Sequence, residues 1–428
     1  MSAKRPRPAG ERPWSLERAE DHLLGLELFG MRFGLDRMRR LLTVLGSPQT
    51  AFASIHVVGT NGKSSTVRMT EELLARHGLR AGSYTSPHLV SFTERVRADG
   101  GEVEPREFAA AVQRAARAAE TVDRMRPADD GVTQFELLTA AAFSALAERG
   151  VEVVVVEAGL GGRWDATNTI PSAVQVLTNV GLEHTRWLGP TVRDIAREKL
   201  AVVHDDSTLV VGADLDPDAL EEATLAASRH KARLIESPPS LPEIAVSAPG
   251  AFQRQNFALA ATVAEAFMGR LDEAAVREVA ASVSVAGRME VVGREPLTIV
   301  DGAHNPAGVR ALVESLPEVV GGRRLVSVVS VLEDKDAAGM LRELLPSSRA
   351  VVFTRNANPR ALSPATLQSL ARQVAADPPD LELEPDPQRA LARARELAGP
   401  RGAVLATGSI YLVSDLARGA TTRRASTL

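Results

Sequence analysis

The sequence contains no cysteine among its 428 residues, which excludes disulfide bonds, thiolate metal sites and a cysteine nucleophile. Aromatic residues make up only 4%, and no uninterrupted apolar run approaches the roughly 20 residues that a membrane-spanning helix needs. Neither sign of charge dominates, because the formal net charge is −4 at pH 7. The composition therefore gives no general attraction to nucleic acid or to a membrane, and we expect small-molecule partners.

The remaining composition is that of a globular protein, with 44% hydrophobic and 24% charged residues. A chain of this length exceeds what one hydrophobic core usually serves, so we expect two domains. Residues 1–13 are basic and rich in proline, without the apolar segment of a secretory signal. We therefore expect a disordered tail there and a cytoplasmic protein.

Short apolar runs alternate with stretches of helical spacing along the chain, which indicates an α/β fold. We expect strands at residues 55–58, 80–84, 151–156, 173–178, 208–211, 297–300, 325–331, 350–353 and 403–407. We expect helices at residues 15–28, 35–45, 64–77, 105–125, 134–149, 192–200, 217–230, 252–269, 272–281, 307–316 and 337–345, with others before Pro378, after Pro387 and after Ser409. Turn residues and charge at 287–296 predict a boundary, with domains at 14–290 and 291–428.

The segment 55–65, Ile-His-Val-Val-Gly-Thr-Asn-Gly-Lys-Ser-Ser, indicates a phosphate site. A β-branched strand leads into a turn in which Gly59 and Gly62 allow close backbone approach, and a helix follows. The free amides of that helix and the Lys63 ammonium would attract phosphate, and Ser64 offers a hydroxyl to Mg²⁺. The loop is shorter than the common nucleotide-binding pattern. An ordinary strand-turn-helix corner with an exposed lysine is the alternative.

Three possible metal ligands stand at expected strand ends or at a helix start. Ser86 precedes a proline, Glu136 lies near the start of a helix and His184 follows a strand. A hydroxyl, a carboxylate and an imidazole could share a divalent cation with nucleotide phosphates. Each residue also has a structural alternative, as a turn residue, as a first-turn carboxylate favoured by the helix dipole, or as a loop histidine.

The segment 301–306, Asp-Gly-Ala-His-Asn-Pro, follows the first strand of the second domain. It places a carboxylate, an imidazole and an amide at a sheet edge. It can also begin a helix, because asparagine and aspartate are preferred caps and proline suits a first helical position. Arg288, in the predicted boundary, could reach phosphate from the second domain or could simply be solvated.

Four ordered motifs together make the chain recognisable: 59–64 (Gly-Thr-Asn-Gly-Lys-Ser), 85–89 (Thr-Ser-Pro-His-Leu), 159–168 (Gly-Leu-Gly-Gly-Arg-Trp-Asp-Ala-Thr-Asn) and 301–306. The chain closely resembles folylpolyglutamate synthase/dihydrofolate synthase, a family that belongs with the Mur ligases. The resemblance runs from about Leu16 to Leu416. It also passes through residues 197–199, 253–256, 287–290, 334–336 and 407–409.

The resemblance implies an N-terminal P-loop ATPase domain with a mainly parallel sheet and a smaller C-terminal Rossmann-like domain, with the active site between them. It implies ATP and two Mg²⁺ ions as cofactors. The implied metal ligands are Ser86, Glu136, His184 and Lys199, the last as a carbamylated lysine. The implied nucleotide ligands are Gly59, Thr60, Asn61, Gly62, Lys63, Ser64, Ser65, Asn256, Arg288 and Asp301.

The same resemblance implies which residues contact substrate and which take part in catalysis. The implied substrate-binding residues are Thr133, Phe135, Gly161, Gly162 and Asp165. The implied catalytic residues are Lys63, Lys199, His304 and Asp301. Four positions depart from the family pattern: Ser64 stands where glycine is frequent, Leu200-Ala201 where Ala-Gly is more usual, and Ala286 where proline is common. None of these changes removes a donor.

The implied activity is ligation of L-glutamate to dihydropteroate, to the glutamate tail of reduced folates, or to both. An acyl phosphate intermediate forms, and ADP and phosphate are released. We expect a monomer. One alternative is a Mur-type ligase that joins an amino acid to another carboxylate, against which the 85–89 and 159–168 motifs argue. The other is a non-catalytic ATP-binding protein, which loss of a metal ligand or of Lys63 would favour.

Overall fold

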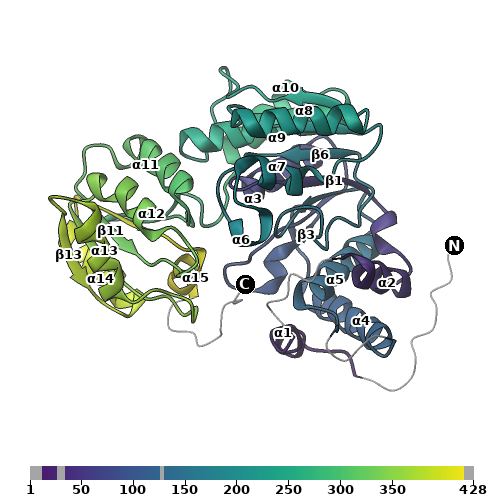
Figure 1. The fold of residues 1–428 in the computed structure, drawn as a ribbon, viewed down its shortest axis with the longest axis horizontal. Helices are drawn as coiled ribbons and strands as arrows, with labels where there is room; N and C mark the ends of the chain where they lie inside the picture. The colour runs from purple at the N-terminus through teal and green to yellow at the C-terminus, as the bar shows by residue number, and fades with distance from the viewer. Residues whose placement is uncertain (1–11, 27–33, 126–129, 419–428) are drawn as a thin grey trace.

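The computed structural model describes residues 12–26, 34–125 and 130–418. Most of the expected disordered tail, and Leu28 at the end of the first expected helix, lie outside these ranges. The described chain forms two parts, each built on its own sheet, and Figure 1 shows the N-terminal part in purple to teal and the C-terminal part in green to yellow. The expected α/β class with a mainly parallel N-terminal sheet and a smaller second sheet is confirmed.

The N-terminal sheet has eight strands in the order β4-β3-β2-β5-β1-β6-β7-β8. Its strands are β1 (Ala53–Val58), β2 (Ala81–Tyr84), β3 (Val96–Ala98), β4 (Gly101–Glu102), β5 (Val153–Glu157), β6 (Val174–Leu177), β7 (Thr208–Val211) and β8 (Arg233–Glu236). All neighbours are parallel except at β3 and β4, which pair antiparallel at one edge. The carboxyl ends of β2, β5, β1 and β6 therefore lie side by side.

Helices cover both faces of this sheet. They are α1 (Leu16–Leu24), α2 (Asp36–Val44), α3 (Lys63–Arg76), α4 (Pro105–Asp123), α5 (Gln134–Arg149), α6 (Thr185–Leu188), α7 (Val192–Leu200), α8 (Pro217–Arg229), α9 (Ala251–Met268) and α10 (Glu273–Ser282), with short 3₁₀ turns at Pro48–Thr50 and Phe92–Arg95. Among the helices that the structure describes, none is both long and apolar enough to cross a membrane.

Strand β5 shows why the sheet needs two layers of helices. All five of its residues are buried, and successive side chains of a strand point to opposite faces. Val153 and Val155 pack in one core with α3, α9 and α10, whereas Val154 and Val156 pack in another with α4 and α5. The expectation of a central strand covered on both faces is confirmed. Such burial is typical of parallel sheets.

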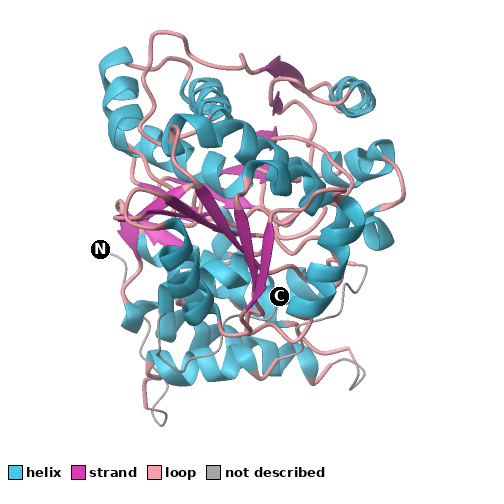
Figure 2. Cartoon of the chain, turned by 90° about the vertical axis from the view of Figure 1, so that its left-hand side faces the viewer, coloured by secondary structure: helices cyan, strands magenta, loops and turns pink. Residues whose placement is uncertain are grey.

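The C-terminal sheet has six strands in the order β13-β12-β11-β14-β10-β9, and only β9 runs antiparallel to its neighbour. The strands are β9 (Glu290–Arg294), β10 (Leu297–Val300), β11 (Leu325–Val329), β12 (Ala350–Phe353), β13 (Asp380–Leu383) and β14 (Ala403–Thr407). The helices are α11 (Pro306–Val320), α12 (Ala337–Leu344), α13 (Pro364–Val374), α14 (Pro387–Ala398) and α15 (Ile410–Arg418), with a 3₁₀ turn at Leu345–Ser347. Figure 2 shows strands as a layer between helices.

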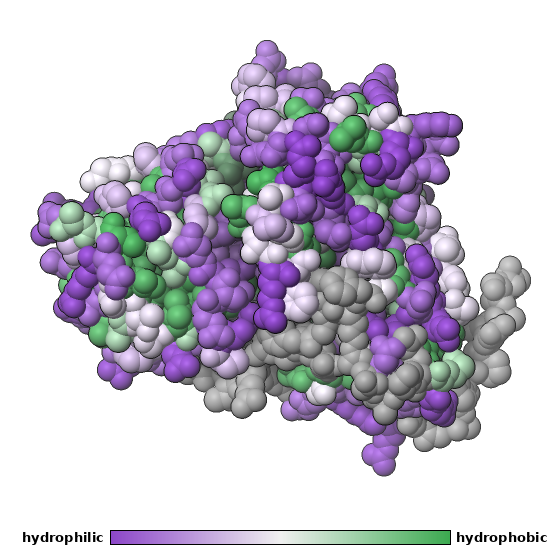
Figure 3. Space-filling model, in the orientation of Figure 1, coloured by the Kyte–Doolittle hydropathy of each residue, from purple (hydrophilic) through white to green (hydrophobic). Residues whose placement is uncertain are grey.

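Several edge strands were not expected from the sequence. The residues predicted as a boundary, 287–296, contain strand β9, which pairs with β10 through its backbone. Val291 and Val292 of this strand are both exposed, so its apolar residues do not alternate between a buried and a solvated face. On the side shown in Figure 3, hydrophobic residues are likewise scattered among hydrophilic ones. Strand β9 belongs to the second sheet and begins at Glu290, next to the predicted boundary. We therefore keep a domain division near residue 290 as our proposal.

His56 is a polar residue in the middle of this apolar sheet. The ring lies on β1 and is fully buried, with Nε2 2.8 Å from the Thr167 hydroxyl. Its Nδ1 atom has no hydrogen-bond partner among the described residues. Burial, aided by the nearby His204, lowers the pKa of His56 from 6.5 to about 3. The folded protein therefore holds this ring neutral.

Acidification should weaken the fold through His56. Below pH 6.5 the unfolded chain binds a proton that the folded chain refuses, so this residue alone lowers the free energy of unfolding by about 2 kcal/mol between roughly pH 7 and pH 5. Urea unfolding of His56→Gln, followed over that range, should show a flatter pH dependence than the parent protein. Equal pH slopes for the two proteins would contradict this role, whatever the absolute stability of the variant.

Candidate active site

The predicted phosphate loop connects β1 to α3 and depends on its two glycines. Gly59 and Gly62 have positive φ angles of 153° and 83°. A Cβ atom on Gly59 would overlap the Thr178 hydroxyl, and one on Gly62 would lie 2.5 Å from Oδ1 of Asn256. Within the described part of the chain, no side chain caps the start of α3. Its first amides are therefore free to bind an anion, as the sequence predicted.

Two lysines converge on this loop. The Lys63 ammonium donates to the carbonyl oxygens of Gly59 and Thr60, both at 3.1 Å, and Lys199 Nζ donates to Gly59 at 2.7 Å. Burial, and after it the charge of Lys63, lowers the pKa of Lys199 to about 7. Burial thus favours the neutral amine of Lys199 over the ammonium form. Carbamylation requires the neutral amine, although the modification itself stays a prediction.

Glu157 is the carboxylate that the structure places beside the phosphate loop. It ends β5, is buried, and accepts a hydrogen bond from the Ser64 hydroxyl at 3.0 Å and another from the Ser86 amide at 3.2 Å. Burial raises its pKa, and the charge of Lys63 opposes that rise. Glu157 was not among the residues predicted from the sequence. A carboxylate at the carboxyl end of the most apolar strand was the available signal, because ligands of α/β sheets gather at such ends.

Glu136 has other partners. Its carboxylate accepts from the amide and hydroxyl of Thr133, at 2.9 and 3.0 Å, and forms a buried ion pair with Arg37 at 3.1 Å. Together with the bond from its own amide to Thr133, this is a capping box at the start of α5. No described hydrogen bond or ion pair joins Glu136 to Ser86 or His184. The structural alternative is therefore observed, and the role of Glu136 as a metal ligand stays a prediction.

His184 begins α6 with a positive φ of 53°. Burial, followed by the charge of Lys335, lowers its pKa to about 4, so the ring is neutral near pH 7 and can donate a lone pair to a metal. Among the described residues, no three His, Asp or Glu side chains form a closed metal cluster. Glu157, Ser86 and His184 each carry a donor that an ion such as Mg²⁺ accepts, since it takes few protein ligands and completes its shell with water and phosphate. A shared ion at these three residues remains a proposal.

The predicted substrate loop, residues 159–168, packs tightly against its neighbours. A Cβ atom on Gly159 would lie 2.6 Å from the Phe135 ring, and one on Gly162 would lie 2.5 Å from the Lys199 carbonyl oxygen. The buried Asp165 carboxylate accepts from the Leu160 amide at 2.8 Å and from the amide and hydroxyl of Thr167. These contacts bring the loop, Phe135 and Lys199 together. Gly161 has a positive φ of 71°, and Thr133 caps α5 nearby.

The C-terminal part brings Asp301 and Arg288 to the same region. Asp301 is buried at the end of β10 and accepts from the Met289 amide at 2.8 Å and the Ala303 amide at 2.7 Å. Burial raises the pKa of both Asp301 and Glu157, and the Arg288 charge acts against the rise at each carboxylate. A Cβ atom on Gly302 would overlap Nη1 of Arg288, so the guanidinium lies against the segment that follows Asp301.

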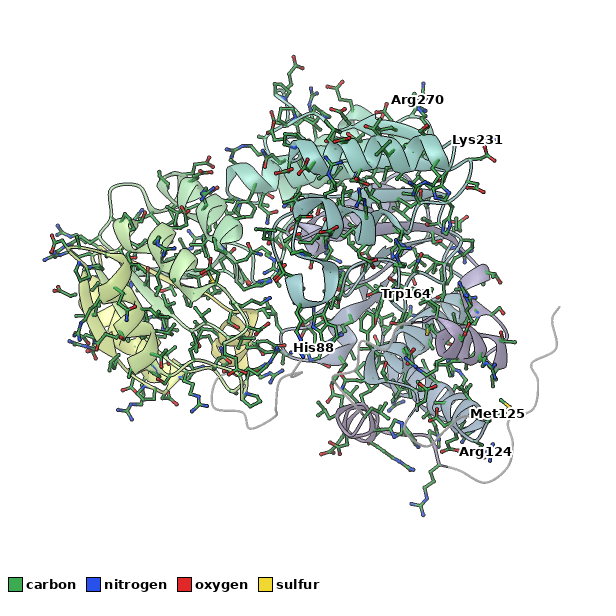
Figure 4. All side chains as sticks on the ribbon, viewed as in Figure 1. His88, Arg124, Met125, Trp164, Lys231 and Arg270 are labelled. Atoms are coloured by element: carbon green, nitrogen blue, oxygen red, sulfur yellow. The ribbon has the colours of Figure 1, made fainter. Side chains whose placement is uncertain are left out.

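Two further predicted residues, and the 85–89 motif, also occupy this region. Asn256 donates to Gln253 Oε1 at 3.0 Å and turns its own oxygen to Gly62. His304 Nε2 is 3.1 Å from Glu183. Figure 4 places His88, which accepts from Arg95 Nε at 2.9 Å, at the boundary of the two parts, whereas Trp164 lies further into the N-terminal part.

Comparison with known proteins identifies the family. Residues 287–410 match the family described as Mur ligase, glutamate ligase domain. The dihydrofolate synthase/folylpolyglutamate synthase of Mycobacterium tuberculosis is 36% identical over 367 residues, which cover 77% of this chain and 75% of that protein. The chain belongs to the folylpolyglutamate synthase/dihydrofolate synthase family. Members of this Mur-type family are ATP-dependent ligases.

Solved structures of this family share the whole fold. The folylpolyglutamate synthase of M. tuberculosis complexed with ADP superposes with a TM-score of 0.88 at 32% identity, covering 96% of this chain and 99% of that one. Escherichia coli FolC in complex with DHPP and ADP has a TM-score of 0.84 at 27% identity, covering 95% of this chain and 97% of that one. The bifunctional synthase from Yersinia pestis complexed with AMPPNP and Mn ion has a TM-score of 0.81 at 29% identity, covering 96% of this chain and 98% of that one.

Two substitutions distinguish the carboxylate beside the loop from the one in the helix cap. Glu157→Gln should weaken Mg²⁺-dependent binding of ADP by roughly tenfold or more, because the amide removes a charge beside Ser64 and Ser86. Glu136→Gln should leave that binding within about threefold and lower the unfolding temperature by roughly 3–5 °C, since it breaks the buried pair with Arg37. Calorimetric titration with and without Mg²⁺, with thermal unfolding of each variant, measures both effects. The reverse pattern would assign the metal to Glu136.

Proposed function

We propose that this protein ligates L-glutamate to dihydropteroate, to the glutamate tail of reduced folates, or to both, with conversion of ATP to ADP and phosphate. The observation that carries the proposal is the Glu157 carboxylate, held between Ser64 and Ser86 beside two lysines that converge on Gly59. That arrangement suits a nucleotide triphosphate and a divalent cation. Family membership supports the choice of glutamate and a folate.

The residues present fit the ATP and the metal that the family implies. In the loop 59–65, the uncapped amides of α3 and the Lys63 ammonium would bind the phosphates of ATP. We assign Glu157, Ser86 and His184 to a divalent ion and keep Glu136 and Lys199 as predicted ligands, the latter in a second site. A bound Mg²⁺ would supply Lewis-acid polarisation of the phosphoryl oxygens. The Mn ion and AMPPNP of the Y. pestis relative support a metal and a nucleotide together.

The chemistry requires that an unreactive carboxylate become an acylating agent. A carboxylate oxygen of the folate substrate attacks the γ-phosphorus, which gives an acyl phosphate and ADP. The amine of L-glutamate then attacks the acyl carbon and expels phosphate, forming the amide. Lys63 stabilises the charge that accumulates on the transferring group. Lys199 donates to the same Gly59 carbonyl oxygen as Lys63, so its charge or its carbamate would act on the same phosphates.

The C-terminal part contributes binding and shielding. Arg288 and Asp301 would contact the nucleotide across the boundary, and His304, 3.1 Å from Glu183, would stand at the point where glutamate meets the acyl phosphate. Residues Thr133, Phe135, Gly161, Gly162 and Asp165 would bind the pterin-bearing substrate. A covered site keeps water from the intermediate, which is a requirement for any acyl phosphate ligase. We propose that the protein acts as a monomer.

The reaction itself can be tested directly. Purified protein with ATP, Mg²⁺ and L-glutamate should release ADP when dihydropteroate or tetrahydrofolate is added in separate assays, and the product mass should rise by one glutamate. A gain with dihydropteroate alone indicates a dihydrofolate synthase, a gain with tetrahydrofolate alone indicates a chain-extending enzyme, and gains with both indicate a bifunctional enzyme.

Absence of glutamate-dependent turnover with both acceptors would overturn the folate assignment. A Mur-type ligase for another carboxylate would still release ADP when given its own acceptor. A non-catalytic nucleotide-binding protein would bind ADP without turnover. A Lys63→Ala variant serves as the inactive control for contaminating ATPases, because it removes the charge beside the transferring phosphoryl group.

A further inference from the structure

A reciprocal pair of amide hydrogen bonds joins the phosphate loop to the C-terminal part. Asn305 Nδ2 donates to Asn61 Oδ1 at 2.9 Å, and Asn61 Nδ2 donates back to Asn305 Oδ1 at 3.3 Å. The two residues are 244 positions apart. Two antiparallel hydrogen bonds between planar amides require the partners to be nearly coplanar, so the pair permits little displacement of one part against the other.

The helix that Asn305 begins fixes the direction of this pair. Asn305 is the N-cap of α11, and its Oδ1 accepts from the Gly308 amide at 2.8 Å. Its Oδ1 atom thus accepts from both the Gly308 amide and Asn61 Nδ2, while its NH₂ group donates to Asn61 Oδ1. Cap and amide pair thus share one side chain, which places the start of α11 against the phosphate loop.

The other partner, Asn61, is equally restrained. The backbone amide of Asn61 donates to Asn179 Oδ1 at 2.9 Å. Its backbone carbonyl oxygen accepts from the Thr178 hydroxyl at 2.6 Å and from Asn179 Nδ2 at 3.2 Å. These groups follow β6, the strand beside β1. Because its backbone is held by these bonds, Asn61 offers Asn305 a partner in a fixed position on the loop.

An ion pair makes a second connection between the same two parts. Lys335 Nζ lies 2.7 Å from Glu183 Oε1, and both side chains are only 10% exposed. Lys335 follows β11 in the C-terminal sheet, and Glu183 follows β6 in the N-terminal sheet. The Glu183 carboxylate also lies 3.1 Å from His304. A poorly solvated pair of this kind is strongly distance-dependent, because little water screens the charges.

We propose that Asn305 and Lys335 are positioning residues, which hold the C-terminal sheet over the nucleotide loops through Asn61 and Glu183 while the amide bond forms. Their part in the reaction is to keep glutamate near the acyl phosphate and water away from it. This inference rests on the proposed function for its catalytic readouts. The two contacts lie at different loops of each sheet, so together they fix an orientation that one contact alone would leave free to pivot.

The test separates coupling from simple folding by conservative variants. Asn305→Asp retains the helix cap, because aspartate is a preferred N-cap, but it replaces the donor to Asn61 with an oxygen. Lys335→Met retains length and removes the charge. Each variant should raise the KM for L-glutamate by about tenfold and the ratio of ADP released to glutamate incorporated by about threefold, while the Kd for ADP stays within about twofold.

A matched control crosses the same boundary away from the loops. Arg254 of α9 pairs with Glu318 of α11 at 2.6 and 2.8 Å, but these side chains are 39% and 43% exposed. Arg254→Ala should leave both the KM for glutamate and the ADP-to-glutamate ratio at parent values. Unchanged ratios in Asn305→Asp and Lys335→Met would overturn the proposal. Parallel loss of ADP affinity, thermal stability and turnover would also overturn it, because a purely structural role predicts that pattern.

Failure of the positioning role can be told apart from failure of the proposed ligase activity. If the parent protein shows no glutamate-dependent turnover, the folate assignment fails, and the positioning role is then read from small-angle scattering with ADP and Mg²⁺. Larger radii of gyration for Asn305→Asp and Lys335→Met than for the parent and for Arg254→Ala would support it. Equal radii for all four proteins would refute it.

Discussion

The candidate site depends on one constraint, which is the parallel register of β2, β5, β1 and β6. Because these four strands lie side by side and run in one direction, every residue that follows them emerges at the same edge. The phosphate loop, Ser86, Glu157 and the Thr178–Asn179 pair meet there although they are far apart in sequence. The second sheet turns its own carboxyl edge towards them, since Asn305 and Lys335 both follow parallel strands.

Burial at this shared edge determines the charge state of the groups that meet there. Lys199 loses much of its affinity for a proton, Glu157 and Asp301 gain affinity for one, and His184 is held neutral. Glu183 differs, because although burial alone would raise its pKa, His304 and Lys335 hold it well below its ordinary value. A site with several such groups is costly to assemble without ligands that carry the complementary charges. The Lys63 ammonium and the buried carboxylates suit a polyanion with a divalent metal.

The sequence predicted the sheets and helices well wherever apolar periodicity was strong or glycine residues marked the turns between elements. The central strands, α3, α5 and α7 follow from patterns that burial enforces. Edge strands such as β9 were missed, because an edge is held by backbone pairing and its side chains need not alternate. The carboxylate beside the loop was not predicted from the sequence, because only the three-dimensional register of the strands shows that Glu157 contacts Ser64 and Ser86. The sequence left either Asn305 or Asp301 as the cap of the following helix; Asn305 is the cap, and its second partner is 244 residues away.

The bonds of Lys63 to Gly59 and Thr60 have a consequence for ion selectivity. In this conformation two of the three ammonium hydrogens are directed to carbonyl oxygens of its own loop, which leaves one for an incoming anion. A small monovalent anion such as chloride gains that single contact. A polyphosphate offers oxygens to Lys63 and to the uncapped amides of α3 together and gains several contacts at once. Discrimination against common salt ions is thus built into the backbone of the loop rather than into the width of an opening.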